Sequence, residues 1–137
     1  MAMPSDEIRA FNEQARTALK ASFNADYDPV AFREARAAPN ILESDSKIVA
    51  AGKGRLEYRP SRGRQRLLVY VSGGGFCFDA SDSHRALVDE VAGALDVDAC
   101  LVRYRLAPEH PFPAAFDDVS AALAQLIEDR GADNVTV

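Results

Sequence analysis

Residues 66–78 read Arg-Leu-Leu-Val-Tyr-Val-Ser-Gly-Gly-Gly-Phe-Cys-Phe, and the rest of the chain can be interpreted outward from this segment. The run 67–71 is uniformly apolar or β-favouring, which is typical of a central strand covered on both faces. Gly73, Gly74 and Gly75 then end the strand. Because glycine has no Cβ atom, a ligand can approach the backbone N–H groups of such a loop closely. Open α/β sheets bind their ligands at this end of the strands.

The glycine loop has four possible interpretations. It can be a tight turn that binds nothing. A dinucleotide-binding loop is excluded, because counting Gly-x-Gly-x-x-Gly from Gly73 puts Phe78 at the last glycine position. A phosphate-binding loop is excluded as well, because no Gly-Lys-Ser or Gly-Lys-Thr follows. An oxyanion hole needs only paired N–H donors directed at the charge that develops on a carbonyl oxygen, so this interpretation stays open beside the simple turn.

Composition limits the classes of protein. With 137 residues, 47% hydrophobic and 27% charged, the chain suits one globular domain with a core. The net charge of −5 argues against non-specific binding to nucleic acid or anionic membranes. No segment has the length and apolarity of a membrane span and no signal-peptide pattern is present, so we expect a cytoplasmic protein. Cys77 and Cys100 stand far apart in the sequence and form no metal-binding or redox motif.

Two helices are predicted before the first strand. Residues 5–22 carry apolar side chains at helical spacing. A second helix should begin at Asp28, with Pro29 in the first helical position, and end near Ala37. We expect residues 1–40 to form a helical segment that folds back onto the rest of the protein.

Strand and helix patterns alternate after this segment, which is typical of a parallel sheet with right-handed crossovers. The glycines at 52 and 54 separate two short strand patterns, a hairpin or bent strand pair. The expected elements are this pair within 47–59, the central strand, a helix carrying Leu87, Val88, Val91, Ala92 and Leu95, a strand at 99–102, a helix carrying Phe116, Val119, Leu123, Leu126 and Ile127 and stopped by Gly131, and the start of a strand at 134–137.

Two motifs together resemble a known family. Residues 72–76 read Ser-Gly-Gly-Gly-Phe, and residues 104–109 read Tyr-Arg-Leu-Ala-Pro-Glu. The pair resembles the hormone-sensitive-lipase-like branch of the α/β-hydrolase carboxylesterases, in which a His-Gly-Gly-Gly loop precedes the second motif with a helix between them. The resemblance implies a three-layer α/β/α fold with a mostly parallel sheet. Residues 41–137 would form its first five of eight strands, and residues 1–40 an N-terminal helical cap segment.

The resemblance also implies roles for the loop. Gly74 and Gly75 would supply two oxyanion-hole N–H groups, while Gly73 and Phe76 would lie against the substrate, Phe76 near the acyl pocket. In such enzymes the nucleophilic serine stands in a Gly-x-Ser-x-Gly elbow after the fifth strand. That pattern occurs nowhere in the sequence, and all three triad members would follow Val137. We therefore expect the N-terminal portion of a serine carboxylesterase for short-chain acyl esters, inactive by itself. The resemblance implies neither a metal nor an organic cofactor.

The other candidate side chains have simpler explanations. His84 stands at a helix start and is interpreted as a capping or packing residue, and His110 as a structural residue of its loop. Cys77 is interpreted as a small buried residue, because no thiol-enzyme signature surrounds it. Asp117 and Asp118 open a helix, where carboxylates favour the helix dipole.

The chain departs from the family's pattern at two positions. Ser72 stands in place of the family's histidine, and Arg103 precedes Tyr104 where these enzymes often have aspartate. Both substitutions leave the geometry of the loop and the preferred substrate open. Neither removes a backbone donor.

Two other functions and two kinds of partner follow from the same resemblance. The functions are a non-catalytic, truncated hydrolase-like protein and a lactonase or amidase on the same fold. The sequence after Val137 would separate them from an esterase. The family orders its strands 1-2-4-3-5-6-7-8, so a strand at 134–137 would be an exposed edge in this chain. We expect it to pair with the rest of the hydrolase or with a second copy, beside a small acyl ester as substrate.

Overall fold

A computed structural model of the protein describes residues 9–10, 13–14, 16–17, 27–35 and 41–137. The chain divides into two compact units, residues 1–36 and 37–137. Among the described residues, no helix is both long and apolar enough to cross a membrane.

In the first unit, the second predicted helix is present as α2 (Pro29–Ala35). The carboxylate of Asp28 caps it as expected, accepting hydrogen bonds from the N–H groups of Val30 at 2.8 Å and Ala31 at 3.2 Å. The helix predicted for 5–22 is helical at its described positions, and its other residues lie outside the described part of the chain. The cap role of residues 1–40 stays a prediction.

The second unit is built on a five-stranded sheet. Its strands lie in the order β1-β2-β4-β3-β5, the order expected of the family's first five. β1 pairs with β2 and β2 with β4 in antiparallel fashion, whereas β3 is parallel to both β4 and β5. The strands are β1 (Lys47–Ala51), β2 (Gly54–Tyr58), β3 (Leu67–Val71), β4 (Asp98–Arg103) and β5 (Val135–Thr136).

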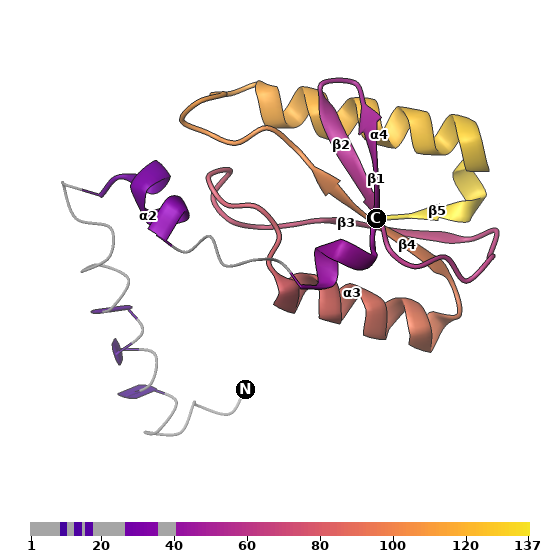
Figure 1. The fold of residues 1–137 in the computed structure, drawn as a ribbon, viewed down its shortest axis with the longest axis horizontal. Helices are drawn as coiled ribbons and strands as arrows, with labels where there is room; N and C mark the ends of the chain where they lie inside the picture. The colour runs from indigo at the N-terminus through magenta and orange to yellow at the C-terminus, as the bar shows by residue number, and fades with distance from the viewer. Residues whose placement is uncertain (1–8, 11–12, 15, 18–26, 36–40) are drawn as a thin grey trace. The chain divides into compact units, whose positions relative to one another are not determined.

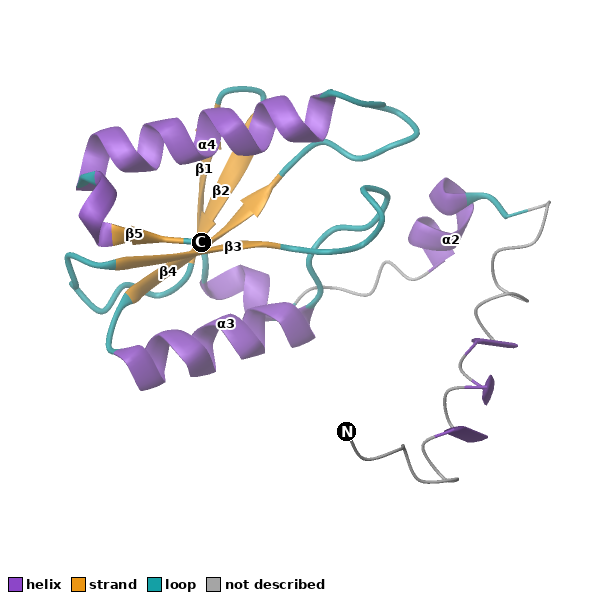
Figure 2. Ribbon diagram, turned by 180° about the vertical axis from the view of Figure 1, so that it is seen from behind, coloured by secondary structure: helices purple, strands orange, loops and turns teal. Residues whose placement is uncertain are grey.

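Two long helices cover opposite faces of this sheet, α3 (Asp82–Leu95) and α4 (Ala114–Arg130) (Figures 1 and 2). Short 3-10 turns, η1 (Leu42–Asp45) and η2 (Ala132–Asn134), precede β1 and β5. The helix predicted to stop at Gly131 does so, and the Gly131 N–H donates to the carbonyl of Ile127 at 2.8 Å. The arrangement confirms the three-layer α/β/α fold.

Both faces of the central strands β3 and β4 are covered by apolar clusters, as the uniform apolar pattern of 67–71 predicted, although Leu68, Tyr70 and Val71 are only partly buried. On β4, Cys100 and Val102 belong to the apolar cluster that includes Leu126 of α4. The alternate residues Ala99 and Leu101 belong to the cluster that includes Val88 of α3. Because successive strand residues point to opposite faces, each helix buries one half of the same strand.

The helices themselves bury less apolar surface than their sequences suggested. On α3, Val88 and Ala92 are buried, but Leu87 and Leu95 are 50% and 56% exposed. On α4, Leu126 is fully buried, whereas Phe116 and Ile127, predicted for the same face, are largely exposed. Charged residues occupy part of the buried faces instead: Arg85 on α3 and Asp118 on α4.

Candidate active site

The glycine loop connects β3 to α3 through a backbone that only glycine adopts easily. Gly74 has a φ of +138° and Gly75 a φ of +58°. The carbonyl of Gly74 accepts hydrogen bonds from the N–H groups of Cys77 at 3.1 Å and Phe78 at 3.2 Å, which closes a tight turn. A Cβ atom on Gly74 would lie 2.8 Å from the carbonyl oxygen of Phe78. Both the torsion angle and the lack of space therefore require glycine at position 74.

Two N–H groups of the loop, those of Gly74 and Gly75, have no acceptor among the described residues. Around Gly73, no atom lies within 4 Å of the place where a Cβ would stand, so space is open there. Free donors beside open space at the carboxyl end of a central strand are what an oxyanion site requires.

The second motif braces this loop. The hydroxyl of Tyr104 donates to the carbonyl of Ser72 at 2.8 Å, and the N–H of Ala107 donates to the carbonyl of Phe76 at 2.9 Å. Burial is the largest influence on the Tyr104 hydroxyl and raises its pKa, so it stays protonated and able to donate. The two motifs, separated by a helix in sequence, thus form one structural unit.

Asp118 has a different role from the one predicted. Its carboxylate is 2% exposed, and it accepts hydrogen bonds from the Arg105 backbone N–H at 2.9 Å and from the Arg105 guanidinium at 2.8 Å. Burial by itself would raise the pKa of Asp118, but the hydrogen bonds and charge of Arg105 outweigh it and lower the pKa. The helix-dipole interpretation of Asp118 was therefore wrong, since this side chain fastens the second motif to α4.

An apolar cavity of about 560 Å³ adjoins the loop. Gly75 and Phe76 of the loop lie along it, opposite the first turns of α4 and the chain that leads into α4. The Phe76 ring, 66% exposed, lies 6.3 Å from the Tyr104 ring between centroids. The cavity is lined by Val71, Ser72, Gly75, Phe76, Tyr104, Ala107, His110, Pro111, Phe112, Ala115, Phe116 and Val119. Most of these side chains are apolar, so the cavity suits the hydrocarbon part of a ligand.

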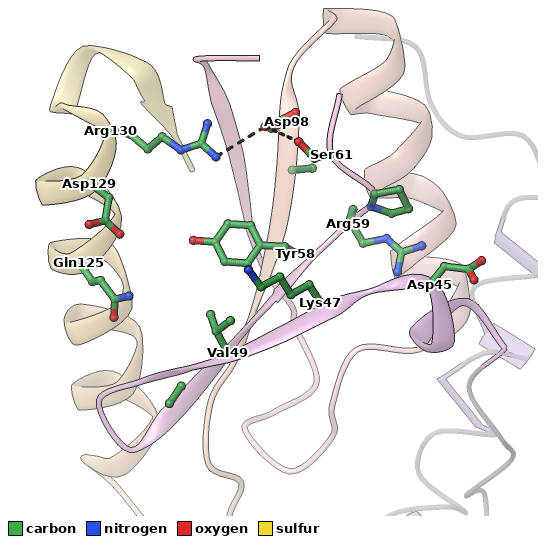
Figure 3. A pocket seen from close by; sticks show the side chains of 13 residues that line it. Asp45, Lys47, Val49, Tyr58, Arg59, Ser61, Asp98, Gln125, Asp129 and Arg130 are labelled. Carbon is green, nitrogen blue, oxygen red and sulfur yellow. Dashed lines mark hydrogen bonds and ion pairs between the residues drawn. The ribbon is translucent and has the colours of Figure 1, made fainter. Parts of the chain in front are cut away.

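A second pocket, of about 610 Å³, lies at the opposite end of β4 (Figure 3). At its upper side, Arg130 lies 3.6 Å from the carboxylate of Asp98, which also accepts a hydrogen bond from the Ser61 hydroxyl at 3.2 Å. Burial would raise the pKa of Asp98, but hydrogen bonds from two backbone N–H groups and from Ser61 lower it. The polar groups around Asp98 bond to one another and hold the loop before β3 in place. Their arrangement therefore needs no ligand to account for it.

Of the remaining candidates, His84 has the capping role predicted for it, the prediction that Cys77 is buried is wrong, and the structural role of His110 stays a prediction. His84 caps α3: its Nδ1 accepts a hydrogen bond from the Ser81 N–H at 3.1 Å. His110 lies in the irregular connection before α4 and lines the apolar cavity. Cys77 is half-buried rather than buried, whereas Cys100 is fully buried and its pKa is raised to about 12 by burial.

Known proteins share the fold described above. A profile of the α/β hydrolase fold matches residues 68–137. The chain is 33% identical over 109 residues to an acetyl-hydrolase of Streptomyces hygroscopicus, which covers 77% of this chain and 36% of that protein. It is 46% identical over 66 residues to the carboxylic ester hydrolase LipN of Mycobacterium tuberculosis, covering 47% and 18% respectively. Among solved structures, an esterase/lipase from an uncultured bacterium aligns with a TM-score of 0.67 and 27% identity, over 96% of this chain and 47% of that one.

The fold and the matching proteins define an esterase- and lipase-type hydrolase. The chain belongs to the α/β-hydrolase fold family, in the hormone-sensitive-lipase-like branch that its two motifs indicated. It spans less than half the length of the relatives it matches.

Proposed function

We propose that this chain supplies the oxyanion hole and one wall of the acyl pocket of a serine carboxylesterase acting on short-chain acyl esters. The observation that carries the proposal is the glycine loop. Within the described residues, Gly74 and Gly75 keep unused N–H groups next to an apolar cavity of about 560 Å³. The name of the acetyl-hydrolase relative supports a short acyl group.

In the proposed reaction, a serine from a further part of the enzyme attacks the ester carbonyl, and negative charge develops on the carbonyl oxygen. The N–H groups of Gly74 and Gly75 donate to that oxygen, with a third donor from the residue after the serine. Because the neighbouring cavity is apolar, water competes weakly with these donors. A histidine paired with a carboxylate moves the proton, and water then releases the acid. Gly73 leaves room for the acyl group, and Phe76 covers it.

A binding experiment tests the donors in this chain directly. The ¹⁵N-labelled protein is titrated with sodium butyrate, the acid that a butyrate ester would release, and its amide signals are followed. A carboxylate oxygen in the hole accepts charge-assisted hydrogen bonds, so we expect saturable shifts at Gly74 and Gly75. 1-Butanol, which has the same chain length but no charge, is the control. Equal responses to both compounds, or none at the two glycines, would refute the assignment.

Activity is tested on two polypeptides. The 137-residue chain should not hydrolyse nitrophenyl butyrate with saturation, because a hole without a nucleophile generates no oxyanion. Saturable hydrolysis by the mass-verified chain, blocked by a serine-directed phosphonate, would contradict this. The longest polypeptide that the encoding DNA specifies should hydrolyse the ester, and Gly74→Pro should lower its kcat by roughly 10²–10³. A kcat within a factor of about two would remove Gly74 from the hole.

The same hole would serve a lactonase or an amidase, so a panel of matched esters, lactones and anilides assigns the substrate class. A polypeptide that binds butyrate but turns over none of them would be a non-catalytic relative.

A partner along the sheet edge is part of this proposal. β5 pairs only with β3 among the described strands, and an unpaired edge offers N–H and C=O groups to another chain. Either a further part of the hydrolase or a second copy would occupy it. Light scattering tests the second case, and a monomer at high concentration whose amides at 134–137 are protected from exchange would refute pairing.

A further inference from the structure

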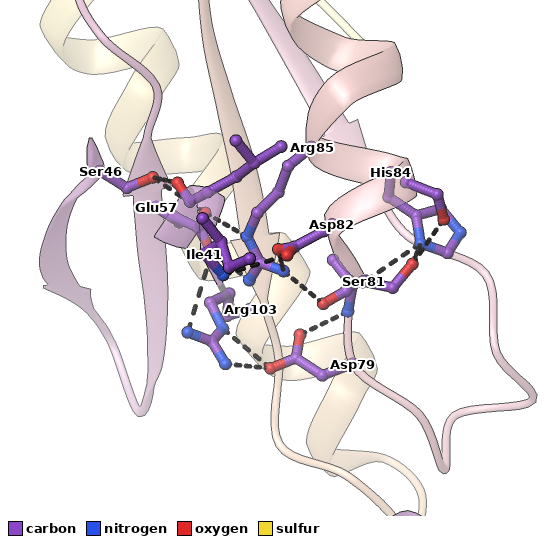
Figure 4. A network of polar contacts seen from close by, with 12 residues as sticks. Ile41, Ser46, Glu57, Asp79, Ser81, Asp82, His84, Arg85 and Arg103 are labelled. Carbon is purple, nitrogen blue, oxygen red and sulfur yellow. Dashed lines mark hydrogen bonds and ion pairs between the residues drawn. The ribbon is translucent and has the colours of Figure 1, made fainter. Parts of the chain in front are cut away.

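The glycine loop ends in a carboxylate whose two oxygens are both engaged. Asp79 follows the loop directly, and its Oδ1 accepts a hydrogen bond from the N–H of Ala80 at 2.8 Å. Its Oδ2 accepts one from Nε of Arg103 at 2.8 Å and another from Nη2 of the same guanidinium (Figure 4). The Asp79 side chain is 29% exposed and that of Arg103 only 12%. A pair this sheltered is screened less by salt than a surface pair.

Arg103 is itself held by the core. It is the last residue of β4, and the five residues before it are all buried. Behind it lies Glu57, fully buried, with Oε2 at 3.8 Å from Nη1 of Arg103. Glu57 in turn accepts hydrogen bonds at 2.7 and 2.8 Å from Arg85, whose side chain is also fully buried. The guanidinium that holds Asp79 therefore belongs to a largely buried network of charged side chains (Figure 4).

One short segment, residues 103–107 at the end of β4, contacts the loop at its start, middle and end. Tyr104 bonds the carbonyl of Ser72 at the start, and Ala107 bonds the carbonyl of Phe76 in the middle. Arg103 bonds Asp79 at the end. The first two contacts are neutral hydrogen bonds. The third is charge-assisted, and hydrogen bonds of that kind are the stronger ones.

A displacement of Asp79 would also move the backbone that carries the N–H groups of Gly74 and Gly75. The residue before it, Phe78, donates its N–H to the carbonyl of Gly74, the residue whose own N–H is left free. We propose that Arg103 is a positioning residue for the glycine loop: it fixes Asp79, and through Asp79 it sets the direction of the N–H groups of Gly74 and Gly75. The inference rests on the proposed oxyanion hole and adds a residue that does not touch the ligand.

The experiment compares four variants of the 137-residue chain. They are Arg103→Met, which keeps an unbranched stem but removes the guanidinium and its charge, Arg103→Lys, Asp79→Asn and the double variant Arg103→Met with Asp79→Asn. Amide signals of Gly74 and Gly75 report the loop's conformation, and hydrogen exchange at the Phe78 N–H reports its opening. For a partly buried ion pair we expect exchange at Phe78 to speed up about tenfold in each neutral single variant. Arg103→Lys should restore most of the protection. The double variant should resemble the single ones, since all three lose the same contact.

The matched control is Arg64→Met, which breaks an exposed ion pair with Asp96 of 2.8 Å in a loop at the other end of the strand. It should leave the signals of Gly74 and Gly75 unchanged. The proposal is overturned if Arg103→Met does the same, or if its effects on the loop are no larger than those on β3 and α3. If Arg103→Met does not fold, Asp79→Asn removes the same contact from its more exposed side and decides the question.

Butyrate titration of the same samples separates this inference from the proposed function. If the pair variants shift Gly74 and Gly75 but butyrate does not shift them in the unsubstituted chain, Arg103 positions the loop and the oxyanion-hole assignment fails. If butyrate binds with the same dissociation constant and the same shifts in Arg103→Met, the hole stands and Arg103 has no positioning role. If both the oxyanion-hole assignment and the positioning role of Arg103 are correct, the dissociation constant for butyrate rises in Arg103→Met and recovers in Arg103→Lys.

Discussion

Alanine at each of the three loop glycines should change stability in a graded order. Gly74 is the most demanding position, because it combines a φ of +138° with a Cβ position 2.8 Å from the Phe78 carbonyl and 3.0 Å from its Cβ. Gly75 has a φ of +58° but open space, and Gly73 has open space and no positive φ. The series therefore separates torsional strain from steric overlap within one turn.

The magnitudes follow from these differences. At Gly74, an unfavourable backbone region costs about 1–3 kcal/mol and steric overlap about as much again. Alanine returns about 0.4–1 kcal/mol by restricting the unfolded chain. We therefore expect Gly74→Ala to lower the free energy of unfolding by about 1–5 kcal/mol. Gly75→Ala should lower it by about 1 kcal/mol or less, because only the left-handed torsion opposes it. Gly73→Ala should be neutral or slightly stabilising.

The assay is urea unfolding followed by far-ultraviolet circular dichroism. The midpoint should shift at unchanged denaturant slope, since the loop contributes little to the surface exposed on unfolding. Equal midpoints for Gly73→Ala and Gly74→Ala would show that the loop does not have the conformation described here. A larger loss at Gly75 than at Gly74 would show that overlap with Phe78 is not the deciding cost.

Three further predictions concern the charged and thiol groups. In the folded chain at pH 8, a thiol reagent should modify Cys77 and leave Cys100, with its pKa of about 12, unmodified until urea unfolds the protein. Because its folded-state pKa is lowered, Asp118 adds stability that is present above about pH 4 and lost as pH falls through that folded pKa, so Asp118→Asn should flatten the acid side of a stability profile. Arg85→Met should cost up to about 3–5 kcal/mol, because the buried Glu57 loses its two shortest ion-pair contacts and keeps the longer ones to Arg59 at 3.4 Å and Arg103 at 3.8 Å; adding Glu57→Gln should recover part of this in thermal melts.

The sequence predicted the features that depend on neighbours along the chain. The run 67–71 gave a strand covered on both faces, the glycines gave the turn after it, and Asp28 and Gly131 gave a helix start and a helix end. Each of these rests on local geometry, which a short segment carries by itself.

The buried charges could not be predicted in the same way. Arg85 lies on the buried face of α3 because Glu57, 28 residues earlier in the chain, neutralises it there. Asp118 is buried because Arg105 meets it from the other motif. A hydrophobic pattern counts such residues as surface, since charged side chains are almost never fully buried unless paired. The pattern therefore placed Leu87 and Phe116 on the buried faces of their helices, whereas both side chains are exposed in the structure.

The backbone conformation of Phe76 bears on the proposed function. It has a φ of +61°, a left-handed conformation that costs a bulky residue roughly 1–2 kcal/mol. Its ring does not offset that cost by burial, since it is 66% exposed. The bond from Ala107 to its carbonyl holds the backbone in place, and the ring is thereby kept beside the apolar cavity. Backbone strain at Phe76 that packing does not explain, next to two N–H groups with no acceptor among the described residues, is what the proposed function expects of a site whose geometry is set before its ligand binds.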